Sequence, residues 1–416
     1  MTSERLGSHR YIAPAQLPEQ THTTAHELPT HDGATVTGLL RTVPSATAVA
    51  FLMHPRQDFS HHVLVPELLH HGYAVWTQGA RSVGNDLALL HEQALLDMAA
   101  GHVFLRRRGF EHVVSVGHSG GGTLATFYLQ QAALSPGERL TDTPTGKRIP
   151  LADAEMPLAD GLALMAPHPG QGALLERMID PSVIDEADPM SIDPDLDPYA
   201  PHNGFATPPS PASYDTDFIA RYRAAQKARI DRIDAIAWER VERSHAARVR
   251  YEEHRDPVDR RTSLASGVIV VHRTDADLRS VDPTLDPNER PYGSLFGHRP
   301  DLTNYGITGF GRLTTPEAWL STWSANATRA DLAACAPGVP VPVLLVELTG
   351  DQACFPRDAE RFTAAFPHPD VTHIRVPGRH FGAPLHEGMA SGATLAGNEI
   401  AHWMSERFPT CSFASA

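Results

Sequence analysis

Residues 112–131, HVVSVGHSGGGTLATFYLQQ, decide the fold of this chain. The first five form a continuous apolar run that predicts a buried strand, and the residues from Gly120 to Ala133 predict a helix. Between the two elements, Ser119 stands at the centre of a G-x-S-x-G pattern. So sharp a turn forces its central residue into a strained backbone and exposes the side chain at the end of the strand. The pattern predicts a nucleophilic serine; the alternative is a glycine-rich turn with no chemistry.

Apolar runs and amphipathic stretches alternate on both sides of this turn. Five further runs are predicted strands: 47–53, 73–77, 161–165, 341–348 and 371–376. Two short strands, 24–28 and 35–41, precede them and are expected to pair as a hairpin around Asp32-Gly33. Because such runs alternate with helical patterns such as 86–108, we expect an α/β fold with a mostly parallel central sheet flanked by helices.

The alternation is interrupted between the strands 161–165 and 341–348. Residues 179–211 are rich in Asp and Pro and cannot form a regular core element. Residues 217–255 carry an apolar stripe that is typical of one long helix or two. We expect a loose N-terminal arm (1–22), a core in two pieces (23–170 and 338–416) and a mainly helical cap inserted between them (171–337).

A serine hydroxyl needs a base, and the base needs a group that orients it. Asp351 and His380 each follow a predicted strand, so both are expected at the carboxyl edge of the sheet, where catalytic groups collect in open α/β sheets. Two other acids compete with Asp351 for this role. Glu347 lies inside the preceding strand, and Asp180 is the nearest aspartate after the strand 161–165.

With Ser119, Asp351 and His380 in this order, the sequence resembles the serine hydrolases of the α/β-hydrolase superfamily, most of all its esterases. The resemblance covers both core pieces and leaves out the insertion. It implies that Ser119 is the nucleophile, that His380 is the general base and then the acid, and that Asp351 fixes the imidazole tautomer. It implies no cofactor.

The resemblance also implies two N–H groups that hold an oxyanion. Gly120 is expected to supply one of them from the start of the helix. The other is usually found in the loop after the first buried strand, which reads His54-Pro55-Arg56-Gln57 here in place of the usual His-Gly. Since proline has no N–H, the Arg56 N–H is the expected donor, and that of Gln57 is the alternative.

The insertion holds aromatic residues that could either line a substrate site or pack the cap. The candidates for substrate contact are Gln57, His118, Tyr292, Phe296, Trp319 and Trp323. Local packing or hydrogen bonding is the simpler reading for His118, which lies inside the turn. The expected reaction is hydrolysis of a carboxylic ester of a small apolar or aromatic substrate. Alternatives are an amide, lactone, thioester or C–C bond, acyl transfer, or a non-catalytic binding scaffold.

Composition argues against several other classes of protein. Of the 416 residues, 41% are hydrophobic and 20% charged, which is ordinary for a globular chain. The net charge of −14 disfavours binding to a nucleic-acid backbone. The sequence has no apolar run of about 18 residues, as a membrane span would need.

Other features bear on partners and compartment. The three cysteines are scattered, and the sequence has no metal-ligand spacing, so neither a disulfide framework nor a metal site is expected. The N-terminus carries no apolar signal segment, which favours the cytoplasm. We expect a small-molecule substrate as the partner, with no nucleic acid and no membrane, and a possible homodimer formed through the cap.

Overall fold

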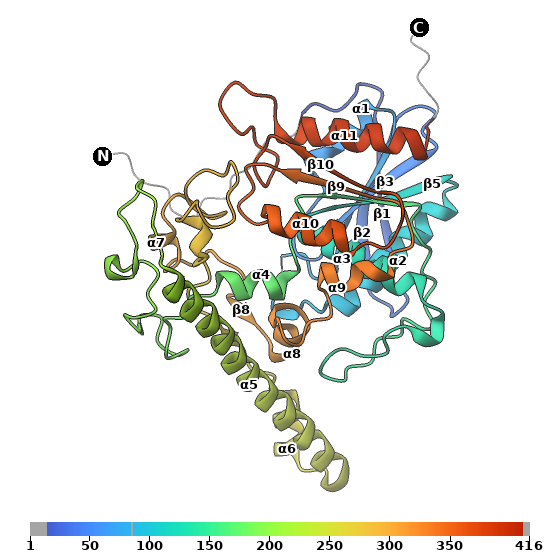
Figure 1. Ribbon diagram of the computed structural model, residues 1–416. Helices are drawn as coiled ribbons and strands as arrows, with labels where there is room; N and C mark the ends of the chain where they lie inside the picture. The colour runs from blue at the N-terminus through green and yellow to red at the C-terminus, as the bar shows by residue number, and fades with distance from the viewer. Residues whose placement is uncertain (1–14, 85, 411–416) are drawn as a thin grey trace.

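The computed structural model describes residues 15–84 and 86–410, and its core is one eight-stranded sheet (Figure 1). The strands are β1 (His22–Pro29), β2 (Thr35–Thr42), β3 (Ala48–His54), β4 (Ala74–Gly79), β5 (His112–His118), β6 (Gly161–Met165), β9 (Val343–Leu348) and β10 (Val371–Val376). Their spatial order is β1-β2-β4-β3-β5-β6-β9-β10. Strand β2 runs antiparallel to β1 and β4, and all other neighbours are parallel, so the predicted mostly parallel sheet is confirmed.

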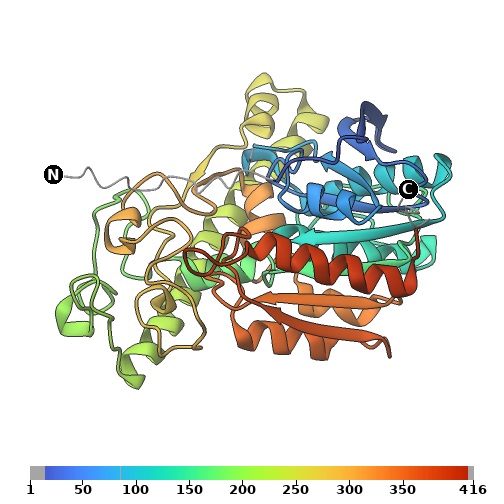
Figure 2. The same ribbon diagram turned by 90° about the horizontal axis from the view of Figure 1, so that it is seen from above.

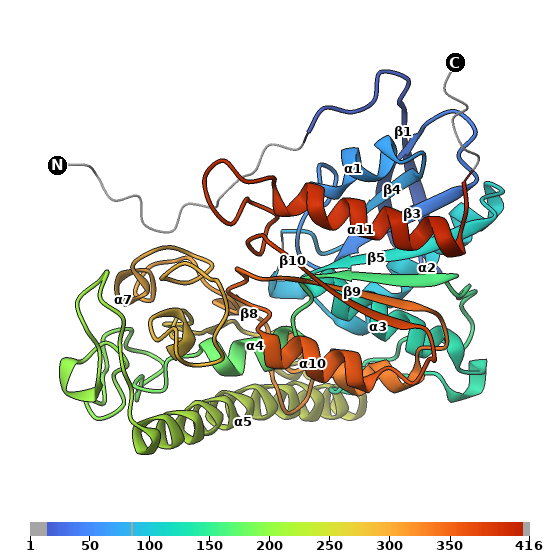
Figure 3. The same ribbon diagram turned by 45° about the horizontal axis from the view of Figure 1, so that its top comes forward.

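Helices cover both faces of the sheet (Figure 3). On one face α1 (Leu64–His70) and α11 (Gly392–Arg407) share an apolar cluster with the central strands. A second cluster packs the other face, where the helices are α2 (His91–Arg107), α3 (Gly120–Ala133), α9 (Leu332–Cys335) and α10 (Pro356–Ala365). Since both faces are covered, all seven residues of β3 are buried, as expected for a continuous apolar run.

Most of residues 171–337 lie beyond the carboxyl ends of the parallel strands (Figure 2), whereas α9 near the end of this segment packs against α3. Besides α9, the α-helices of this segment are α4 (Gln171–Met178), α5 (Thr216–His254), α6 (Pro257–Leu264), α7 (Pro300–Thr303) and α8 (Pro316–Ala318). Strands β7 (Ile269–Val270) and β8 (Leu313–Thr314) pair as a small second sheet. The rest is largely irregular, and the Asp- and Pro-rich residues 179–211 hold only a short 3₁₀ turn, so the segment is less helical than expected. The predicted domain boundaries stay a prediction.

The long helical pattern forms a single helix, α5, of 39 residues. Its buried residues include Tyr222, Gln226, Ile230, Ile233, Ala237 and Val241 of the predicted stripe, whereas Phe218 is buried in place of the expected Ile219. The C-terminal half of α5, with α6 packed beside it, extends away from the sheet (Figure 1). Despite its length α5 is strongly charged, and no helix within residues 15–84 and 86–410 is both long and apolar enough to cross a membrane.

Candidate active site

The turn between β5 and α3 has the strained geometry that its sequence predicts. Ser119 adopts φ 55° and ψ −126°, a region that costs a non-glycine residue about 1–3 kcal/mol. The turn is so tight that a Cβ on Gly117 would lie 2.4 Å from the Cα of Gly122. Small residues at these two positions therefore allow the strand to pass directly into the helix. Ser119 therefore lies at the carboxyl edge of the sheet, and the residue is 7% exposed.

The structure brings Ser119, His380 and Asp351 together from three separate strand ends. The Nε2 atom of His380 lies 3.0 Å from the Ser119 Oγ, and its Nδ1 lies 2.9 Å from both carboxylate oxygens of Asp351. One of these oxygens also accepts hydrogen bonds from the backbone N–H groups of Ala353 and Cys354. Donors surround the Asp351 carboxylate, so Nδ1 carries the proton and Nε2 offers its lone pair to the serine hydroxyl.

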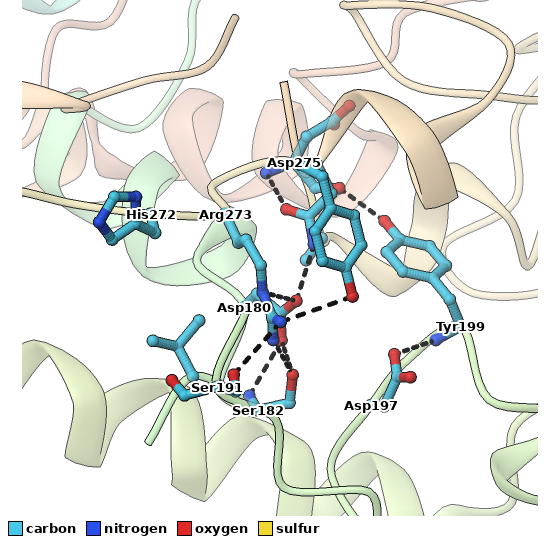
Figure 4. A network of polar contacts seen from close by, with 12 residues as sticks. Asp180, Ser182, Ser191, Asp197, Tyr199, His272, Arg273 and Asp275 are labelled. Carbon is cyan, nitrogen blue, oxygen red and sulfur yellow. Dashed lines mark hydrogen bonds and ion pairs between the residues drawn. The ribbon is translucent and has the colours of Figure 1, made fainter. Parts of the chain in front are cut away.

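The two competing acids are engaged elsewhere. Asp180 is buried within residues 171–337, where it forms an ion pair with Arg273 at 3.1 Å and accepts a hydrogen bond from Asn304 (Figure 4). Glu347 lies 3.0 Å from Arg375 on the neighbouring strand. Asp351 is therefore the acid that the structure places against the imidazole of His380.

His118 is used within the protein, as local hydrogen bonding predicts. Its Nε2 lies 2.8 Å from the backbone oxygen of His380, so this nitrogen must donate. Its Nδ1 accepts from the Nε2 of His62 at 2.9 Å, and the His62 Nδ1 accepts in turn from the Leu64 N–H. With both ring nitrogens engaged, His118 anchors the loop of His380, and its assignment as a substrate contact is wrong.

The predicted second oxyanion donor is also wrong. The N–H groups of Arg56 and Gln57 both donate to the Nδ1 of His54, at 3.0 and 2.9 Å, which leaves neither pointing at Ser119. The Arg56 guanidinium forms an ion pair with Asp86 at 2.5 Å and lies 4.6 Å from the ring centroid of Trp323. Proline at position 55 shapes a turn that folds back onto its own histidine.

Three side-chain nitrogens crowd the space beside Gly120 instead. A Cβ placed on this glycine would lie 2.6 Å from the Nε2 of Gln171, 2.8 Å from that of His168 and 2.9 Å from that of His54. All three side chains are at most 3% exposed. Sequence reasoning missed His168 and Gln171, although both follow the carboxyl end of β6, where site residues of α/β sheets are found.

Burial keeps the imidazoles around Ser119 neutral. It holds the pKa of His54, His118 and His168 well below the ordinary 6.5. The same effect lowers the pKa of His62 to about 3 and that of His91 to about 4. At neutral pH each of these rings therefore has one N–H and one lone pair.

Most of the expected aromatic wall packs the cap. Trp319 is fully buried among apolar side chains of α4 and α5, and its Nε1 donates to Asp234 at 2.6 Å. Tyr292 packs against a separate cluster that includes Tyr214. The assignment of these two aromatic residues to the substrate site is therefore corrected to cap packing.

Two aromatic residues remain connected to the loop after β3. Phe296 stacks edge-to-face on Phe310 with 5.1 Å between ring centroids, and Phe310 lies 6.3 Å from Trp323. Trp323 is itself fully buried, and the Arg56 guanidinium of that loop lies close to the rings of both Phe310 and Trp323.

The serine turn after β5, the sheet order and the Ser–Asp–His order along the chain belong to one known architecture. The chain has the α/β-hydrolase fold. Within it, the strained turn at Ser119 follows β5, and Asp351 and His380 follow β9 and β10. The resemblance inferred from the sequence holds at the level of the fold.

Solved structures with this fold align over most of the chain at low identity. An esterase domain from a Rhodothermus marinus protein is 12% identical, with 92% of this chain and 99% of that one covered and a TM-score of 0.42. The Pyrococcus furiosus esterase Pf2001 is 10% identical, with 96% of this chain and 99% of that one covered and a TM-score of 0.42. The α/β hydrolase GrgF from Penicillium sp. sh18 is 11% identical, with 93% of this chain and 99% of that one covered and a TM-score of 0.48. No protein-family profile and no curated protein sequence matches the chain.

Proposed function

We propose that the chain is a serine hydrolase that cleaves carboxylic esters through an acyl-enzyme. The observation that carries this proposal is the strained Ser119 whose Oγ lies 3.0 Å from the Nε2 of His380, while the buried Asp351 holds the opposite ring nitrogen. An idle glycine-rich turn would need neither the imidazole nor the carboxylate. The same geometry argues against a non-catalytic scaffold.

In the proposed reaction His380 takes the proton of Ser119 as the hydroxyl oxygen attacks the ester carbonyl. Asp351 stabilises the imidazolium that forms, and the carbonyl oxygen becomes an oxyanion beside the Gly120 N–H. His380 then passes its proton to the alcohol, which leaves. A water molecule, deprotonated by the same imidazole, finally attacks the acyl carbon and releases the acid.

The structure changes which substrates we propose. A small apolar or aromatic ester was expected because of an aromatic wall, but most of that wall packs the cap. The side chains nearest Gly120 are those of His54, His168 and Gln171. Because these groups are polar, the proposal is not limited to an apolar or aromatic ester.

The direct test of this function is the Ser119→Ala variant in a hydrolysis assay with p-nitrophenyl acetate and a short panel of thioesters and anilides. We expect its rate with the preferred substrate to fall by about 10⁴-fold or more, to the level left by binding alone. Ser135→Ala removes a hydroxyl at the opposite end of α3 and should leave the rate unchanged. Equal rates for the parent and Ser119→Ala would contradict the proposal.

A further inference from the structure

The loop after β3 presents an imidazole, and not a backbone amide, to the space beside Gly120. A backbone N–H can only donate, and two of them, from Arg56 and Gln57, point at the Nδ1 of His54. Nδ1 is therefore the unprotonated nitrogen of a neutral ring, and the proton sits on Nε2. That Nε2 is one of the three nitrogens that surround Gly120.

His168 repeats this arrangement from the other side. Its Nδ1 accepts the Gly170 N–H at 3.0 Å, so its Nε2 also carries the proton. A point 1.5 Å from the Gly120 Cα, where a Cβ would stand, is 2.8 Å from this nitrogen and 2.9 Å from the Nε2 of His54. Two N–H donors from separate loops thus converge beside the residue that follows Ser119.

A buried side-chain amide lies on the same side of Gly120 as the two imidazoles. Gln171 is 1% exposed, its side chain lies beside the buried His91, and neither its Nε2 nor its Oε1 makes a hydrogen bond of good geometry in the part of the chain that the structure describes. Its Nε2 lies 2.6 Å from the same point beside Gly120. An unpartnered buried amide costs about 1–3 kcal/mol, so a ligand oxygen in van der Waals contact with Gly120 would stabilise it by accepting a hydrogen bond.

We propose that the oxyanion hole of this enzyme is built from side chains. The Nε2–H groups of His54 and His168 donate to the substrate carbonyl oxygen together with the Gly120 N–H, in place of a second backbone amide. This inference rests on the proposed function, because it needs Ser119 to attack a carbonyl carbon. Burial supports it, since it lowers the pKa of both rings and keeps each as a single fixed donor.

Each imidazole accepts hydrogen bonds at Nδ1 and donates one at Nε2, and substitutions can remove the donor while they keep an acceptor. In asparagine the side-chain oxygen is as many bonds from Cβ as the Nδ1 of histidine, so His54→Asn and His168→Asn keep an acceptor for the backbone N–H groups and remove the Nε2–H. In glutamine the side-chain nitrogen matches Nε2, so His168→Gln restores that donor. His102→Asn is the control, because His102 is a buried ring on α2 that stacks on Tyr128.

The experiment measures the rate at which diisopropyl fluorophosphate modifies Ser119. The Oγ–P bond forms, the P–F bond breaks, fluoride leaves and His380 takes the proton, while the phosphoryl oxygen occupies the hole. Removing one donor from such a hole costs about 10²–10³-fold in catalysis, so we expect each Asn variant to react at least about 10-fold more slowly. His168→Gln and the His102→Asn control should stay within about 3-fold of the parent.

The outcomes separate the two proposals. If the parent is modified at Ser119 and both Asn variants react as fast, the side-chain hole is overturned and the proposed function stands. If the parent is not modified, or is modified equally with Ser119→Ala, the proposed function is overturned and the hole with it.

A second measurement covers variants that fail to fold. In the parent labelled with ¹⁵N-histidine, two Nε2–H resonances should shift when the Ser119 adduct forms, because both protons gain a phosphoryl acceptor. Unchanged imidazole resonances in a fully modified sample would also overturn the side-chain hole.

Discussion

At the scale of single residues, hydrogen bonds from the backbone set the chemistry of the histidines around Ser119. His54 and His168 each accept backbone N–H groups at Nδ1, whereas His380 donates its Nδ1 proton to Asp351. The first two rings can therefore only donate at Nε2, and the third offers a lone pair there. Histidine thus carries a proton at Nε2 in two positions of this site and a lone pair at Nε2 in the third.

The bond from His118 to the His380 carbonyl predicts a specific defect. His118→Phe keeps a ring of similar shape and removes both hydrogen bonds of the imidazole. We expect the rate of ester hydrolysis to fall by about 10- to 100-fold, because the loop that holds the base loses its anchor. Each buried group left unpaired should also cost about 1–3 kcal/mol of unfolding free energy.

The neighbouring His61 gives a matched control, since it is exposed and lies directly beside His62 in the chain. His61→Phe should leave both hydrolysis and urea-induced unfolding unchanged. If His118→Phe has the kcat of the parent, the hydrogen bond from His118 to the His380 carbonyl does not position the base.

Which site residues could be predicted depended on whether local sequence determines their place. Ser119 was found because the strand–turn–helix pattern is contained in a few consecutive residues. Asp351 and His380 were found because each closely follows an apolar strand. The donors His54 and His168 were missed, because their role depends on how side chains from two distant loops turn toward Gly120. The assignments of Arg56 and Trp319 failed for a similar reason. The His54 side chain turns its Nδ1 toward the Arg56 N–H, and the Trp319 side chain turns into the cap.

At the scale of secondary structure, the elbow depends on close backbone packing between β5 and α3. Gly117→Ala would place a Cβ 2.4 Å from the Cα of Gly122, so backbone must move. We expect a loss of about 2–4 kcal/mol in unfolding free energy, measured in urea, or a failure to fold. Gly137→Ala is the control, because no heavy atom lies within 4 Å of its Cβ position, and it should change stability by no more than about 0.5 kcal/mol. Equal stability of the two variants would contradict this view of the turn.

Element boundaries followed the sequence where apolar periodicity was uninterrupted. The predicted helix from Gly120 to Ala133 and the strands 161–165 and 371–376 agree with α3, β6 and β10 to the residue. The predicted helix 86–108 is divided, because α2 begins only at His91, after a 3₁₀ turn and an extended residue. Short helices of the insertion such as α6 were missed, since eight residues with no buried face carry no periodic signal.

The outer end of α5 and α6 carries exposed apolar side chains. They include Val249, Val258 and Leu264. The expected homodimer through the cap stays a prediction, and these residues are where its interface would be sought.

At the scale of the whole molecule, two distant core pieces complete one sheet, and buried histidines are spread through it. Strands β9 and β10 add to a sheet whose other six strands precede the insertion, so neither piece can bury its apolar faces alone. Burial lowers the pKa of six imidazoles that lie in the interior: His54, His62, His91, His102, His118 and His168.

Because the pKa values of these imidazoles are lowered, we predict that the protein loses stability in mild acid. Their pKa values are lower in the folded state than the unfolded value of about 6.5, so the unfolded chain binds protons first as the pH falls. The unfolding free energy should therefore decrease from pH 7 to pH 5, by more than the about 1.4 kcal/mol per pH unit of a single group. Asp275 opposes this trend, because burial raises the pKa of its carboxyl to about 6 and favours its protonated form in the folded state.

Urea unfolding at pH 7, 6 and 5 measures this effect. His102→Phe removes one of the six rings at a position away from Ser119 and should reduce the pH dependence. Equal unfolding free energies at pH 7 and pH 5 in the parent would contradict the account of buried neutral imidazoles.

The central claim is that His380 and Asp351 activate Ser119, and mass spectrometry of the protein after reaction with a fluorophosphonate tests it most directly. We predict a single adduct on the peptide that contains Ser119, formed rapidly by the parent, lost in Ser119→Ala and greatly slowed in His380→Ala. An unmodified parent, or an adduct on another residue that persists in Ser119→Ala, would contradict the account.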